Sequence, residues 1–135
     1  MCNPRGAVVA YLEDDCLIAD TMVDIFEGLG CRLIMAADGE EMMAKLASND
    51  LVPDVVVSDF FLPGDNGAVM IARIRLAIDR AVPAILLTGY GVTSELMAQM
   101  PSNVTLLTKP VWLHTLQETL AALGVGVGML QDVPG

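Results

Sequence analysis

The chain has 135 residues, of which 54% are hydrophobic and 18% charged; this suits one domain with a single core and argues against a disordered chain. Its formal net charge of −10 argues against a surface that binds nucleic acid directly. We see no apolar run long enough to span a membrane and no signal peptide, so we predict a cytoplasmic protein without a membrane partner. The cysteines, Cys2, Cys16 and Cys31, have neither CxxC nor zinc spacing and are expected to be free thiols.

The first third of the chain alternates apolar runs with helical patterns. Residues 7–12 predict a buried strand, and the acidic residues 13–15 follow it at once. A helical pattern follows residue 15 and is stopped by Gly28 and Gly30; a strand is then predicted over 31–36, and a second helix opens at residues 38–41 and is closed by residues 48–50. The residues expected on the inner faces are Ile18, Met22, Ile25, Phe26 and Leu29 in the first helix, and Met42, Met43, Leu46 and Ala47 in the second.

The rest of the chain continues this alternation. Three consecutive valines within residues 54–58 predict a strand buried on both faces, as in a parallel sheet. Asp59 follows this strand, and a turn-rich loop leads into a third helix, in which Arg73, Arg75 and Arg80 are expected to point outward. The remaining predicted elements are a strand over 83–87, a short helix capped by Thr93 or Ser94 that ends before Pro101, a strand over 104–108, and a last helix over 111–123.

Five predicted strands alternating with five predicted helices indicate an α/β fold, with a parallel sheet covered by helices on both faces. Polar residues come directly after four of these strands: Glu13 and Asp14, Asp59, Thr88, and Lys109. Because parallel strands bring their carboxyl ends to one edge of the sheet, these residues are expected to converge on one pocket. Taken alone, Asp59 is equally consistent with a residue that only caps a turn.

The chemistry of this pocket can be predicted from its residue types. Three clustered carboxylates repel one another unless a cation neutralises them, and oxygen-only ligands suit Mg²⁺. Lys109 can pair with a phosphoryl oxygen, and Thr88 supplies a hydroxyl. The sequence shows no Ser-His or Cys-His pair, no Walker loop and no GxGxxG motif. We therefore predict attack by one carboxylate on phosphorus, with the metal and Lys109 stabilising the developing charge.

These residues, together with the loop over residues 62–67, resemble the receiver domain of two-component response regulators. The resemblance covers residues 6–124 and leaves residues 1–5 and 125–135 as terminal tails. It implies a flavodoxin-like (βα)5 three-layer sandwich, with a five-stranded parallel sheet of order 2-1-3-4-5.

The resemblance also implies roles for individual residues. Asp59 would accept a phosphoryl group from a sensor histidine kinase or a phosphotransfer protein. Asp14, Asp59 and the backbone carbonyl of Phe61 would ligate Mg²⁺ or Mn²⁺, with Glu13 acting mainly through water. Thr88 and Lys109 would bind the phosphoryl group. Such a protein is a signalling phosphoacceptor with metal-dependent self-phosphorylation and self-dephosphorylation chemistry, and is not classed as an enzyme.

One position departs from the pattern of the family. Leu106 stands where many members carry an aromatic residue, so we expect no aromatic gate. We expect instead an output face that repacks and binds a partner or a second copy, built from Met97, Met100, Leu106 and Trp112. Asp15 is expected to cap a helix rather than bind metal, and His114 to lie on the surface.

Three other functions compete with this interpretation. The chain could serve as the receiver module of a hybrid kinase or a phosphorelay. An aspartyl phosphatase dependent on Mg²⁺ would need a second Asp two residues after the nucleophile, where this chain has Phe61. A flavodoxin-like electron carrier would need a Ser/Thr/Gly-rich phosphate loop after the first strand, where this chain has residues 13–15, Glu-Asp-Asp.

Overall fold

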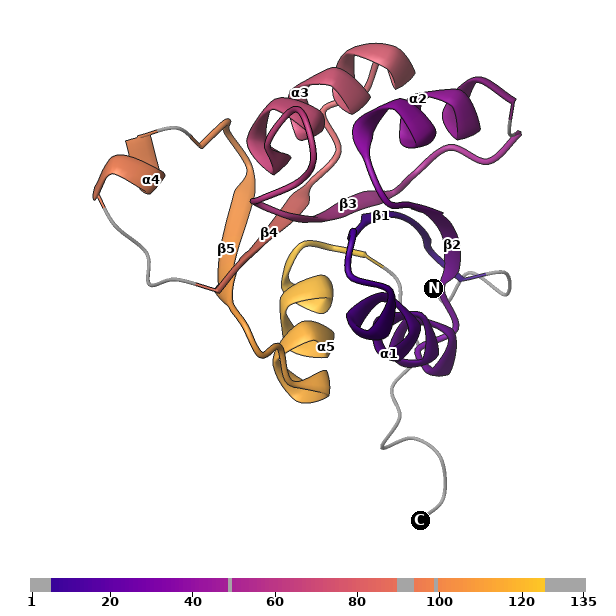
Figure 1. Cartoon of the computed structure of the whole chain (residues 1–135). Helices are drawn as coiled ribbons and strands as arrows, with labels where there is room; N and C mark the ends of the chain where they lie inside the picture. The colour runs from indigo at the N-terminus through magenta and orange to yellow at the C-terminus, as the bar shows by residue number, and fades with distance from the viewer. Residues whose placement is uncertain (1–5, 49, 90–93, 99, 126–135) are drawn as a thin grey trace.

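A computed structural model of the chain describes residues 6–48, 50–89, 94–98 and 100–125. Strands and helices alternate along it, as predicted (Figure 1). The strands are β1 (Val8–Leu12), β2 (Arg32–Ala36), β3 (Val55–Asp59), β4 (Ala84–Thr88) and β5 (Val104–Thr108). The helices are α1 (Cys16–Gly28), α2 (Gly39–Ser48), α3 (Gly67–Ile78), α4 (Ser94–Ala98) and α5 (Leu113–Ala122).

The strands form one parallel sheet in the order β2-β1-β3-β4-β5, which confirms the predicted topology. Helices α1 and α5 cover one face of the sheet, and α2 and α3 cover the other (Figure 1). The result is the predicted three-layer, flavodoxin-like arrangement. Within the described ranges, no helix is both long and apolar enough to cross a membrane.

Each face of the sheet has its own hydrophobic core. The core beneath α1 and α5 includes Tyr11, Phe26 and Leu116, all fully buried. The core beneath α2 and α3 includes Met42 and Ile71, also fully buried. Strands β1, β3 and β4 are buried along their whole length, as continuous apolar runs predict, whereas β5 is half-buried at the edge of the sheet.

Several sequence-based assignments need correction. Asp59 and Thr88 are the last residues of β3 and β4 and do not lie beyond them. Ile18 and Ala47 were expected on inner faces but are exposed. Ile18 is not among the residues on the buried face of α1, and Ala47 lies near the end of α2. Arg75 does not point into solvent: its guanidinium donates to three loop carbonyls, those of Val82, Ser102 and Asn103, at 2.8, 2.8 and 3.0 Å.

The ends of the helices follow from local capping. The Asp15 carboxylate accepts hydrogen bonds from the N–H groups of Leu17 and Ile18, which confirms it as the cap of α1. Val125, the first residue of the predicted C-terminal tail, is buried in the core beneath α1 and α5. The other tail residues, and the proposed cap Thr93, lie outside the described residues.

Candidate functional site

The register of the sheet brings the predicted polar residues to one edge. Leu12 of β1 is level with Ser58 of β3, so Glu13 follows beside Asp59. Thr88 of β4 is level with Thr108 of β5, so Lys109 continues along the same edge. The backbone N–H of Lys109 donates to the Thr88 carbonyl at 2.7 Å, and this bond holds the lysine backbone beside the end of β4.

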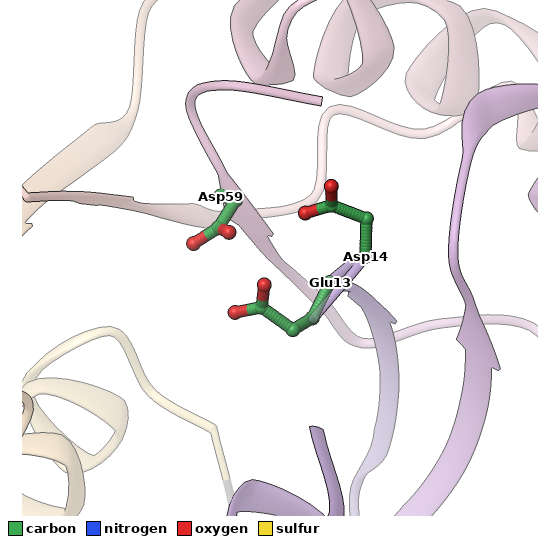
Figure 2. A group of neighbouring side chains, drawn as sticks. All are labelled: Glu13, Asp14 and Asp59. Carbon is green, nitrogen blue, oxygen red and sulfur yellow. The ribbon is translucent and has the colours of Figure 1, made fainter. Parts of the chain in front are cut away.

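Glu13, Asp14 and Asp59 form a compact acidic cluster at this edge. One carboxylate oxygen from each residue lies within 4.8 Å of the others. Glu13 and Asp59 are buried, whereas Asp14 is exposed, so the cluster opens to solvent on the Asp14 side. Figure 2 shows the side chains of Glu13 and Asp14, which follow β1, near the Asp59 side chain at the end of β3.

Lys109 joins this cluster from the neighbouring strand. Its ammonium group lies 2.5 Å from Oδ1 of Asp59 and 3.3 Å from Oε1 of Glu13. A quarter of the lysine side chain is exposed, whereas the two carboxylates it contacts are almost entirely buried. A single cation therefore faces two buried carboxylates, and the site retains excess negative charge.

The pKa values of these groups reflect this imbalance. Burial raises the pKa of Asp59 to about 7; the neighbouring Glu13 adds to this effect and Lys109 opposes it. Burial by itself would lower the pKa of Lys109, but its contacts with Asp59 and Glu13 outweigh burial and raise it. The lysine is therefore a persistent cation, whereas Asp59 is only partly ionised at neutral pH unless further positive charge lies nearby.

Tyr11 also belongs to the site, although no sequence pattern singled it out. Its hydroxyl lies near the Glu13 carboxylate, which has the largest electrostatic effect on it. Burial, followed by the charges of Glu13 and Asp59, raises the pKa of this hydroxyl well above its usual range. The only available signal was a tyrosine, two residues before Glu13, in an otherwise aliphatic strand.

The backbone around Asp59 is tightly packed against the start of α3. The Ser58 hydroxyl donates to the Asp59 carbonyl at 2.8 Å, and the Gly67 N–H donates to the Phe60 carbonyl at 2.7 Å. A Cβ on Gly67 would collide with the Asp59 carbonyl oxygen and with the Leu86 side chain. Gly67 is thus required by close approach, a role that the sequence analysis had not assigned to it.

The other predicted residues lie at various distances from this centre. Thr88 is buried at the end of β4. Phe61 is 60% exposed, and its ring packs edge-on against that of Phe60, with ring centroids 4.9 Å apart. His114 is exposed on α5, as predicted, and its Nε2 lies 3.4 Å from Oε2 of Glu118.

The residues predicted to form an output face differ in their packing. Met97 and Trp112 are 56% and 70% exposed. Met100 and Leu106 are instead partly buried against the core beneath α2 and α3.

The residues present fit a hard divalent cation. The acidic cluster offers carboxylate oxygens only, two of them in a buried setting with excess negative charge, and one side opens to solvent. This donor set suits Mg²⁺, which prefers a few carboxylates and retains several waters. Nitrogen or sulfur ligands, which other metals prefer, are absent from this cluster.

Comparison with known proteins identifies the family. The family model for the response regulator receiver domain matches residues 9–121. The chain belongs to this family. Solved structures share the fold of this chain. The receiver domain of the hybrid histidine kinase CckA superposes with a TM-score of 0.71 at 24% identity, covering 86% of this chain and 97% of that one. The chemotaxis protein CheY4 of Vibrio cholerae gives a TM-score of 0.74 at 24% identity, covering 87% and 98%.

Curated relatives include larger regulators. The uncharacterized transcriptional regulatory protein YbdJ of Bacillus subtilis is 31% identical over 106 residues, which are 78% of this chain and 45% of that protein. The DNA-binding response regulator MtrA of Mycobacterium tuberculosis is 30% identical over 95 residues, which are 70% of this chain and 40% of that protein. This chain thus spans less than half the length of these relatives.

Proposed function

We propose that this chain is a phosphorylation-switched receiver in two-component signalling, and that Asp59 accepts the phosphoryl group. One observation carries the proposal: the Asp59 carboxylate lies 2.5 Å from the Lys109 ammonium and within the acidic cluster of Glu13 and Asp14. This arrangement provides a nucleophile, a cation for the transferred group, and oxygen ligands for a metal.

The reaction assigns a separate task to each residue. An oxygen of Asp59 attacks phosphorus and forms the new O–P bond, while the bond from phosphorus to the donor histidine nitrogen breaks and leaves its electron pair on nitrogen. Lys109, already in contact with Asp59, moves to the oxygens of the transferred group and offsets their charge. Glu13, Asp14, Asp59 and the Phe61 carbonyl would hold Mg²⁺ or Mn²⁺, which when bound neutralises charge on the carboxylates and the phosphoryl oxygens.

The metal also has a role before the reaction. Because burial and Glu13 raise the pKa of Asp59 to about 7, an appreciable share of the metal-free protein carries a protonated Asp59 at neutral pH. A protonated carboxyl is a poor nucleophile. A divalent cation at the acidic cluster favours the ionised form, so phosphorylation is expected to require the metal.

The proposed donor is a sensor histidine kinase or a phosphotransfer protein. Membership of the receiver family supports this class of partner. A receiver from a hybrid histidine kinase has the same fold, so a place within a hybrid kinase or a phosphorelay is the alternative setting. MtrA is described as a DNA-binding regulator, but this chain matches only 40% of it, and we propose no direct DNA contact for the receiver.

The proposed switch depends on Thr88. Phosphorylation would draw the Thr88 hydroxyl towards a phosphoryl oxygen and leave a space near Leu106 on the neighbouring strand. Leu106 has no ring or hydroxyl, so the change would spread as repacking of apolar groups over α4, β5 and α5. Met97, Met100, Leu106 and Trp112 are the proposed movable parts of a face that binds an output partner or a second copy.

The direct test is incubation with acetyl phosphate and Mg²⁺, followed by measurement of the intact mass. The parent should gain the mass of one phosphoryl group, and only when the metal is present. Asp59→Asn should gain none. Asp65→Asn, which alters an exposed carboxylate paired with Arg73, is the matched control and should be phosphorylated like the parent. Equal phosphorylation of Asp59→Asn and the parent would overturn the assignment.

A further inference from the structure

Arg75 of α3 binds the segments that lead into two strands. Its Nε donates to the Val82 carbonyl at 2.8 Å, just before β4. Its two Nη atoms donate to the carbonyls of Ser102 and Asn103 at 2.8 and 3.0 Å, directly before β5. The guanidinium is a rigid planar fork, so one side chain fixes the positions of both strand starts relative to α3.

The turn before β5 has an uncommon backbone conformation, which this contact holds. Asn103 has a φ of 57°, in the left-handed region that residues other than glycine rarely adopt. Its carbonyl accepts from two donors, the Arg75 guanidinium at 3.0 Å and the Ala84 N–H at 3.2 Å. Ala84 is level with Val104, so these two bonds help to set the register in which β5 begins against β4.

Helix α3 is also attached to the functional site. At its first residue, the Gly67 N–H donates to the Phe60 carbonyl at 2.7 Å, and Gly67 packs closely against the Asp59 carbonyl. Asp59 lies at the carboxyl-terminal edge of the sheet, whereas Asn103 lies at the amino-terminal edge. One helix therefore connects the backbone of the proposed phosphoacceptor to the start of β5.

Strand β5 is consequently held at both ends. The Arg75 contacts hold the turn before it, and the Lys109 N–H, which donates to the Thr88 carbonyl at 2.7 Å, holds the residue after it. The residues between, Val104–Thr108, form an edge strand of the sheet and are half-buried over most of their length (Figure 1). Half-buried side chains can repack at low cost, whereas a strand held at both ends cannot slide along its neighbour.

We propose that Arg75 is a positioning residue that anchors the start of β5 to α3 in both states of the switch, an inference that rests on the proposed function of Asp59. Phosphorylation then repacks side chains along β5, such as Leu106, without displacing the turn at residues 102–103. Because the Arg75 contacts are kept in both states, they favour neither state over the other.

The test compares two variants of this arginine. Arg75→Met keeps an apolar stem and removes all three donors, whereas Arg75→Lys keeps the charge and loses the fork. Arg80→Met is the matched control, since it makes the same change at an exposed arginine just after α3. Calorimetry measures the binding of beryllofluoride with Mg²⁺, the phosphoryl mimic, and NMR records the amide shifts that this mimic causes. Hydrogen exchange of the Ala84 amide reports on the turn directly.

In the parent and in Arg80→Met, the mimic should shift the amides of residues 106–108 and leave those of Ala84 and residues 102–103 unshifted. In both Arg75 variants, the Ala84 amide should exchange about tenfold faster, because the carbonyl it binds is no longer held by the guanidinium. The shifts caused by the mimic should then extend to residues 102–103. The affinity for the mimic should stay within about twofold of the parent's, since both states lose the same contacts.

Two results would overturn the anchor. A change of more than about twofold in the affinity of Arg75→Met for the mimic would mean that the contacts differ between the states. Mimic-induced shifts that stay confined to residues 106–108 in this variant would mean that Arg75 only stabilises the fold. If the parent binds the mimic but its residues 102–103 move, the anchor alone fails; if the parent does not bind the mimic, the proposed function of Asp59 fails.

Discussion

The two sides of the site are packed very differently. On one side, β1 and β3 are buried along their whole length and end in Glu13 and Asp59, which are buried as well. On the other side, β5 is half-buried over most of its length, and its last residue, Thr108, is exposed. We call the β1–β3 side the tighter side and the β5 side the looser side. Lys109 extends from the end of β5 to the carboxylates of Glu13 and Asp59 on the tighter side.

This difference suggests how a local charge change can spread. Closely packed side chains have few alternative positions, whereas half-buried ones can be rearranged at lower cost. Lys109 contacts Asp59 through its side chain and Thr88 through its backbone N–H. A new charge on Asp59 therefore acts on the looser side through Lys109 and Thr88, while β1 and β3 hold the site in place.

The largest expected effect tests the difference in packing itself. Phe26 is fully buried against Tyr11, so Phe26→Ala should lower the free energy of unfolding by about 3–5 kcal/mol. Trp112, at the start of α5, is 70% exposed, and Trp112→Ala should change the free energy of unfolding by no more than about 0.5 kcal/mol. Urea denaturation followed by circular dichroism measures both. Similar losses in the two variants would refute the contrast between the two sides.

The next effect concerns the buried carboxylate of Asp59, on the side of the site formed by β1 and β3. The pKa of Asp59 is raised from 3.8 to about 7, so the folded protein binds this proton more tightly than the unfolded chain does. The contribution of Asp59 to stability is therefore fully present below the unfolded pKa and is lost as the pH rises towards 7. Because an amide does not ionise, Asp59→Asn removes this pH-dependent loss of stability.

At pH 7.5 without metal, we expect Asp59→Asn to be more stable than the parent by roughly 1–3 kcal/mol, with the difference shrinking towards pH 4. Thermal unfolding across this pH range measures it. Asp65→Asn, at an exposed site, is the control and should follow the parent at every pH. A variant that is less stable than the parent at pH 7.5 would mean that Lys109 outweighs burial.

A smaller effect is expected from the metal. Mg²⁺ should stabilise the parent by about 1.4 kcal/mol when its free concentration is ten times the dissociation constant. Asp14→Ala should abolish this response, because it removes the exposed ligand of the cluster. Asp20→Ala, on the exposed side of α1, should retain it. Scanning calorimetry with and without Mg²⁺ distinguishes them, and a full response in Asp14→Ala would move the metal elsewhere.

The smallest energetic effect concerns how far the switch spreads from Asp59. Beryllofluoride with Mg²⁺ should shift amide resonances of the loops around Asp59 and also of α4, β5 and α5, with β2 unaffected. Thr88→Ala should confine the shifts to the loops. NMR spectra of the two proteins test this directly. Silence of the α4–β5–α5 side in the parent would mean that its half-buried residues are static packing.

Much of this protein could be predicted from its sequence. The order and type of the elements followed from local patterns, because valine runs such as 55–57 and the helical spacing of apolar residues depend only on neighbours along the chain. The convergence of Glu13, Asp14, Asp59 and Lys109 also followed, because parallel strands always end at a common edge. The cap at Asp15 is equally local.

Other features were decided by tertiary structure alone. Arg75 was expected in solvent, yet three carbonyls from two loops meet its guanidinium, and no local pattern records such an approach. Gly67 and Tyr11 likewise acquire their roles from groups on other segments or from burial: the Asp59 carbonyl in one case, and the enclosed hydroxyl beside Glu13 in the other. Sequence patterns report which side chains point the same way along one segment, whereas the burial and charge that set the pKa of Asp59 come from several strands packed together.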